Sequence, residues 1–225
     1  DIKRNYLRKI YKLIKLENYK QILLYTVSFL IFSSLVYLNI PLFFSYDKSK
    51  IENIICKDFS IKCSIQGSIK YSFFPSPRFK INDFIIRDFT DENKILGKIE
   101  TLEARVSVYS IYKKDFIYYR VDLINYEMNF NLQKVKQYNH FFDGKIITKP
   151  INFKNGQINF YDNKKYISAI RSAKLKYKSS KKLDEVILKG LFLNDHIYVN
   201  LQNKKNETKP LKTLTVKLLK SKFSA

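Results

Sequence analysis

The spacing of hydrophobic and polar positions changes along this chain and divides it into segments. Residues 21–46 carry no charged side chain, and their apolar residues occur on every side of a helix. A helix rises about 1.5 Å per residue, so this run can cross roughly 30 Å of hydrocarbon. We predict a transmembrane helix at residues 21–46. Two alternatives are a buried core helix and a cleaved signal peptide.

Residues 1–20 combine many lysines and arginines with apolar residues at helical spacing, such as Tyr6, Ile10 and Leu13. This pattern predicts a cytoplasmic basic amphipathic segment, either on the anionic leaflet or free as a solvated tail. Few basic residues follow the apolar run, so the positive-inside tendency predicts a cytoplasmic N-terminus. In a bacterium this gives a single-pass inner-membrane protein with its C-terminal domain in the periplasm.

A short helical pattern follows at residues 47–59. Ile51, Ile54 and Ile55 mark one helix face, and Ser49 and Glu52 have the spacing of a capping box. We predict a juxtamembrane helix here.

Beyond residue 60 the period changes to two. Leu102, Ala104, Val106 and Val108 alternate with polar residues, which is typical of a half-buried strand. Two similar runs at residues 119–123 and 126–132 predict neighbouring antiparallel strands. Further strands are predicted at residues 79–86, 158–161, 173–178, 186–193, 197–201 and 214–218. Such strands can form two layers, a barrel or an open trough, and the period does not separate these outcomes.

Composition narrows the possible functions. The formal charge is +22, from 42 Lys and Arg against 20 Asp and Glu, so anionic phosphate groups are favoured partners. A periplasmic location favours phospholipid over nucleic acid. His140 and His196 have no metal-ligand spacing, and no phosphate-binding loop or nucleophile motif occurs. We expect no enzyme activity, no metal and no cofactor.

Cys56 and Cys63 are the two cysteines of the chain. An oxidising periplasm permits a local disulfide between them, but their spacing equally allows two unpaired thiols.

Several short motifs occur in a characteristic order behind the apolar helix. They are Gln66-Gly67-Ser68-Ile69, Phe74-Pro75-Ser76-Pro77, Asn139-His140-Phe141, Phe153-Lys154-Asn155-Gly156-Gln157-Ile158 and Leu188-Lys189-Gly190-Leu191. With these motifs the chain resembles the N-terminal region of AsmA-like proteins. It departs from the family in two ways. The position of the family's Gly-containing turn is occupied here by residues near Cys56-Lys57-Asp58. The chain also stops where many members continue, so residues 60–225 are expected to be a C-terminally truncated domain or a short paralogue.

The resemblance implies a mainly β fold behind a transmembrane helix and a short helix. Its curled antiparallel sheet would form an open trough that accepts acyl chains, as in bridge-like lipid transfer proteins. It also implies a role in outer-membrane lipid transport and homeostasis, with phospholipid and envelope proteins as partners. The alternative is an anchored envelope structural or interaction module, with a closed β domain and no lipid cargo. The candidate lipid-binding residues are Val106, Val108, Val121, Leu123, Met128, Phe130, Ile158 and Phe160.

Overall fold

The computed structural model describes residues 19–59, 61–88, 91, 93–113, 116–138, 149–180, 183–204 and 211–224. The chain divides into two units, Asp1–Phe44 and Ser45–Ala225, and each is described by itself. The predicted amphipathic segment at residues 1–20 lies outside the described residues except for its last two. The motif at residues 139–141 also lies outside them.

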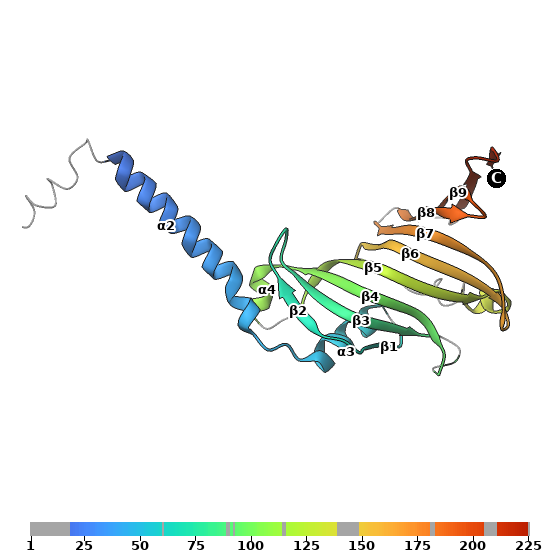
Figure 1. Cartoon of the computed structure of the whole chain (residues 1–225), viewed down its shortest axis with the longest axis horizontal. Helices are drawn as coiled ribbons and strands as arrows, with labels where there is room; N and C mark the ends of the chain where they lie inside the picture. Colours follow the sequence, from blue (N-terminus) through green and yellow to red (C-terminus); the bar gives the residue numbers. More distant parts are fainter. Residues whose placement is uncertain are drawn as a thin grey trace, which may run out of the picture. The chain divides into compact units, whose positions relative to one another are not determined.

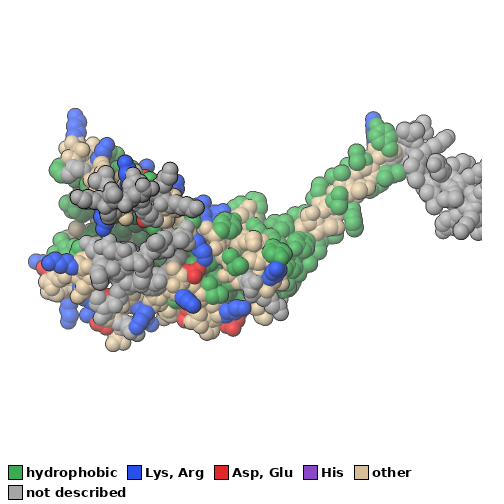
Figure 2. Space-filling view, turned by 180° about the vertical axis from the view of Figure 1, so that it is seen from behind, with side chains coloured by type: hydrophobic (Ala, Val, Ile, Leu, Met, Phe, Trp, Pro, Cys, Tyr) green, Lys and Arg blue, Asp and Glu red, His purple; other side chains and the backbone are tan. Residues whose placement is uncertain are grey.

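The first unit contains α2 (Tyr19–Asn39) and the short 3-10 helix η1 (Ile40–Phe43). Together they are long and apolar enough to cross a membrane, and Figure 2 shows hydrophobic side chains along the helix. The hydroxyl groups of Thr26 and Ser34 each donate to a carbonyl oxygen four residues earlier, at 2.8 Å. Their polar groups are therefore satisfied within the helix. The prediction of a helix able to span a membrane is confirmed.

The second unit begins with α3 (Lys48–Phe59), which confirms the predicted short helix. Its first turn is capped by Asp47, whose carboxylate accepts a hydrogen bond from the backbone N–H of Lys50 at 3.2 Å. The predicted capping box of Ser49 and Glu52 is wrong. The Glu52 carboxylate instead accepts from the backbone N–H of Ile65 at 2.7 Å and so ties α3 to the sheet.

One 11-stranded sheet makes up most of the second unit (Figure 1). Strands pair in the order β1-β3-β4-β5-β6-β7-β8-β9-β10-β11, and β2 also pairs with β3. The sheet is not closed into a barrel, so an open, mainly β fold behind a short helix is confirmed. The strands are β1 (Cys63–Ile65), β2 (Ile69–Ser72), β3 (Arg78–Arg87), β4 (Ile95–Val106), β5 (Tyr118–Asn131), β6 (Ile151–Asp162), β7 (Lys165–Ser179), β8 (Leu183–Phe192), β9 (Asp195–Lys204), β10 (Leu211–Leu218) and β11 (Phe223–Ser224).

The pair β5–β6 is parallel, whereas the other pairs are antiparallel. This differs from the expected antiparallel sheet. A parallel pair arises because β6 begins at the same end of the sheet as β5, which requires the chain to return between them.

Residues 119–123 and 126–132 are not two strands. The first run and most of the second form the single strand β5, and Leu132 begins the 3-10 helix η2 (Leu132–Lys134). Asn125 has a φ of 53°, and its pairing with both neighbouring strands is interrupted there without a change of register. This left-handed residue brings Leu123 and Tyr126 to the same face, although they are an odd number of positions apart.

Comparable residues lie close together on neighbouring strands, and we call them the left-handed row. Asp83 in β3, Asn125 in β5, Asn155 in β6 and Ser172 in β7 all have φ values between 48° and 53°. Each of them is left out of the strand pairing, and the register shifts only near Asn155 and Ser172. Asp and Asn adopt this left-handed conformation more readily than most residues. The left-handed row therefore keeps the apolar side chains on one face along the full length of each strand.

Most of the hydrophobic core lies between α3 and strands β3 to β6, and Ile170 and Ala173 of β7 also belong to it. Ile51 and Ile55 of α3 are 4% and 0% exposed and belong to the same buried cluster as Phe84 of β3. In β6, a Cβ on Gly156 would overlap the ring of Tyr126. Because glycine leaves this space free, the Tyr126 ring crosses β6 and its hydroxyl donates to the carbonyl oxygen of Ala173 in β7 at 3.1 Å.

A second short helix, α4 (Val108–Tyr112), follows β4. Its N-cap is Ser107, whose hydroxyl oxygen accepts from the backbone N–H of Ser110 at 3.2 Å. Val108 was predicted to continue the preceding strand, and this is wrong, because the strand ends at Val106.

Candidate functional site

Two continuous rows of apolar residues cross the sheet from β3 to β10. Each row has one residue per strand, and neighbours along a row are directly paired. At about 4.8 Å between strands, each row extends about 34 Å. The first row is Phe79, Ala104, Val121, Ile151, Tyr177, Val186, Leu201 and Leu214. The second row is Ile81, Leu102, Leu123, Phe153, Leu175, Leu188, Val199 and Val216.

The exposed fraction of the side chains rises along the first row from β5 to β10, although all of these residues are hydrophobic. Val121 is 0% exposed and Ile151 is 6%, whereas Leu201 is 39% and Leu214 is 59% exposed. A polar outer strand would be the ordinary way to end such a sheet. Here the apolar face continues into water-accessible strands.

The gradient follows from what covers the face. The described helix α3 packs at the β1 side of the sheet and supplies buried isoleucines to the core. Among the described residues, no helix packs extensively on β7 to β10. Nearly all positions of β8 are half-buried as a result. We call the apolar side of β7 to β10 the open apolar face.

The candidate lipid-binding residues fall into three groups. Val106, Val121, Leu123 and Ile158 are 1%, 0%, 2% and 7% exposed and belong to the packed core. Met128, Phe130 and Phe160 are half-buried and pack at the margin of this core. Val108 lies on α4, away from the strand rows. Contact of any of these residues with lipid stays a prediction.

The more accessible members of the two rows were not among the candidate residues. Val186, Leu188 and Val199 lie on strands that the period-two pattern correctly located. The same alternation that drew attention to β5 was present there. What the sequence did not show was which part of the apolar face α3 covers.

On the opposite, polar face, Asp122 is fully buried within a group of basic and amide side chains. Its carboxylate accepts hydrogen bonds from Arg105 at 3.3 Å, Arg120 at 2.9 Å, Lys154 at 3.1 Å and Asn152 at 2.7 Å. Burial alone would raise the pKa of Asp122, but these bonds hold the pKa below its ordinary value. The group joins β4, β5 and β6 across the parallel pair.

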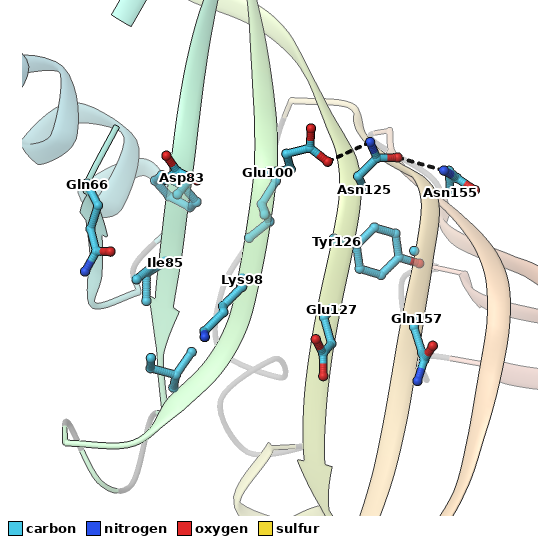
Figure 3. Close-up of a pocket in the computed structure, with 14 residues that line it drawn as sticks. Gln66, Asp83, Ile85, Lys98, Glu100, Asn125, Tyr126, Glu127, Asn155 and Gln157 are labelled. Carbon is cyan, nitrogen blue, oxygen red and sulfur yellow. Dashed lines mark hydrogen bonds between the residues drawn. The ribbon is translucent and has the colours of Figure 1, made fainter. Parts of the chain in front are cut away.

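A depression of about 850 Å³ lies beside the left-handed row and is lined mostly by polar side chains. Figure 3 shows Glu100, Asn125 and Asn155 pointing toward one another across three strands. Asn125 donates to the Glu100 carboxylate at 2.8 Å, and Asn155 donates to the Asn125 side-chain oxygen at 2.7 Å. No group of three metal-ligating side chains occurs among the described residues. These hydrogen bonds join β4, β5 and β6 at the left-handed row.

Cys56 and Cys63 are joined by a disulfide between α3 and β1, with 5.6 Å between their Cα atoms. Near the end of the same helix, Lys149 lies 2.6 Å from the Asp58 carboxylate and 3.8 Å above the Tyr118 ring. A covalent bond and an ion pair therefore both hold α3 over the core.

Comparison with known proteins adds no family assignment to this geometry. No family model matches the chain, and no curated protein is significantly similar to it in sequence.

Proposed function

We propose that this protein is a membrane-anchored phospholipid-handling protein. In this proposal α2 and η1 span a bacterial inner membrane, and the second unit lies in the periplasm, where the open apolar face accepts acyl chains. The function would serve lipid transport toward the outer membrane, as the resemblance to AsmA-like proteins implies. The observation that carries the proposal is the first apolar row, which continues for four strands beyond buried Ile151 while exposure rises to 59% at Leu214.

The energetic argument is that this surface is unfavourable in water. Burying apolar surface contributes about 25 cal/mol per Å². Contiguous exposed apolar surfaces larger than a few hundred Å² are rare in proteins that bind nothing there. An acyl chain can remove this surface from water without requiring hydrogen bonds, because the rows contain only Tyr177 with a polar side-chain group.

Dimensions also suit an acyl chain. The hydrocarbon core of a bilayer is about 30 Å deep and two chains thick, so one chain extends about 15 Å. The four strand intervals from β6 to β10 cover about 19 Å. The charge of +22 favours the phosphate of a lipid head group as the polar partner.

Site-specific photocrosslinking in membranes tests the proposal on the full chain. A photoreactive amino acid at Val199 would face the open apolar face, whereas the same group at the next residue, Asn200, would face the polar side. Both positions are half-buried, so they form a matched pair. We expect phospholipid adducts, identified by mass spectrometry, at Val199 and few at Asn200.

Two results would contradict lipid handling. Equal lipid adducts at both positions would show contact without a dedicated face. Protein adducts at Val199 without lipid would instead support an anchored interaction module.

A further inference from the structure

A second exposed apolar surface lies at one end of the sheet, apart from the open apolar face. Phe74, Tyr109, Ile117 and Tyr119 are 73%, 65%, 61% and 52% exposed. Phe74 lies in the turn between β2 and β3, Tyr109 in α4, Ile117 directly before β5, and Tyr119 at the start of β5. We call these four residues the aromatic tip.

Strand pairing brings these segments together. Arg78 at the start of β3 pairs with Arg105 near the end of β4, and Val106 pairs with Tyr118 at the start of β5. The backbone N–H of Val106 also donates to the carbonyl oxygen of Pro77 at 3.1 Å. Figure 1 shows α4 beside the β2–β3 hairpin at this end of the sheet.

The chain enters the second unit at this same end. The ring of Tyr46 meets that of Phe79 edge to face, with 4.6 Å between ring centroids. Phe79 follows the first residue of β3, close to the β2–β3 turn. Only Phe44 and Ser45 separate Tyr46 from the last residue of η1, and three extended residue steps reach no farther than about 11 Å.

Basic residues lie at this end as well. The Lys113 ammonium is 4.6 Å from the centre of the Tyr109 ring. Exposed lysines Lys178 and Lys204 lie at the end of β7 and β9, which the strand directions place at the same end of the sheet as the start of β5. Aromatic rings beside lysines are typical of surfaces that lie among phospholipid head groups.

We propose that the aromatic tip rests in the head-group region of the bilayer that α2 spans. The inference rests on the membrane anchoring proposed above, but it does not require lipid in the open apolar face. If α2 spans the bilayer, the short connection would keep this end of the sheet near the membrane. The exposed rings would lose contact with water there, and the lysines would meet lipid phosphates. The open apolar face would then begin close to its source of phospholipid.

The absence of Trp from the sequence permits a direct test. Four single-Trp variants of the full chain would be reconstituted in phosphatidylcholine and phosphatidylglycerol vesicles with brominated acyl chains, which quench nearby Trp. Phe74→Trp and Tyr109→Trp report on the aromatic tip. Leu193→Trp reports on the β8–β9 turn at the opposite end, where Leu193 is 77% exposed. Phe32→Trp in α2 reports on the anchor.

We expect strong quenching and blue-shifted emission at Phe74→Trp, Tyr109→Trp and Phe32→Trp, and water-exposed, unquenched emission at Leu193→Trp. All four positions are exposed, so the larger ring does not disturb the core, and circular dichroism would verify this.

If the two tip variants match Leu193→Trp while Phe32→Trp is quenched, the tip proposal is wrong and the anchor stands. If Phe32→Trp is also unquenched, the anchor itself is refuted. Both outcomes are independent of the crosslinking result at Val199.

Discussion

At the scale of single residues, Asp122 is a fully buried carboxylate that joins three strands of the second unit. Its side chain is 0% exposed, and it is the shared acceptor for Arg105, Arg120 and Lys154. Removing the anion leaves cations close together without compensation. Removing one partner of a buried ion pair lowers stability strongly, whereas replacing the whole pair by apolar residues is often neutral.

We predict that Asp122→Asn lowers the free energy of unfolding by about 2–3 kcal/mol at pH 7, less than for a fully buried pair because the cations are partly exposed. The folded-state pKa of Asp122 lies below its ordinary value of about 3.9. The stabilisation is therefore complete above that value and is lost as pH falls through the folded-state pKa. Urea unfolding of both proteins in detergent micelles, followed by circular dichroism, should show curves that converge below about pH 4. A constant difference at every pH would contradict the ionic explanation.

At the scale of secondary-structure elements, α3 determines which part of the sheet is covered. Ile51 and Ile55 pack on the core, Glu52 binds the β1 backbone, and the disulfide adds a covalent connection. The loop closed by the disulfide is short, with a sequence separation of seven. Its expected contribution is correspondingly modest.

Reduction of the Cys56–Cys63 disulfide is predicted to lower the free energy of unfolding by about 2 kcal/mol without unfolding the protein. The remaining contacts of α3 keep it in place. Urea unfolding with and without reductant measures the change. The control is a Cys56→Ser/Cys63→Ser double variant, which should be as stable as the reduced protein and insensitive to reductant. A reductant effect in that variant would assign the change to another cause.

Most of the secondary-structure elements could be predicted from the sequence. Helical spacing located α3, and period-two alternation located most strands, because both patterns report which face of an element is apolar. The left-handed residue Asn125 was misread as a strand boundary, since its reversed backbone conformation interrupts the period of two just as a turn does. The parallel pairing of β5 with β6 depends on the return of the chain and leaves no periodic signature.

The site was less predictable than the fold for a related reason. Alternation marks Val121 and Val199 as equally apolar, yet the first is in the packed core and the second lies on the open apolar face. The difference is made by α3, which is far from both residues in sequence. The local spacing of apolar residues does not show which part of a sheet a distant helix will pack against.

At the scale of the whole molecule, the proposals require one topology. The basic segment before α2 would remain in the cytoplasm, and the second unit would lie beyond the inner membrane. The Cys56–Cys63 disulfide leaves no native thiol to react in the absence of reductant. Introduced cysteines can therefore report this topology without removal of the native pair.

We predict that a membrane-impermeant maleimide labels Leu193→Cys in intact spheroplasts, because this turn is exposed and would be periplasmic. Lys9→Cys, outside the described residues, should be labelled only after the inner membrane is opened. Gel-shift detection of the labelled chain is sufficient. The opposite pattern would place the second unit in the cytoplasm and rule out periplasmic lipid handling.

The rising exposure along the apolar rows also has a consequence for how the sequence can vary. Around Val121, neighbours fill the space on every side, so a substitution must preserve volume as well as polarity. No described helix packs against Val199, so the volume of its side chain is less constrained. An apolar residue of different size should preserve the open apolar face there. Two halves of one sheet would therefore diverge at different rates, and relatives of this protein should be easier to recognise through β3 to β6 than through β7 to β10.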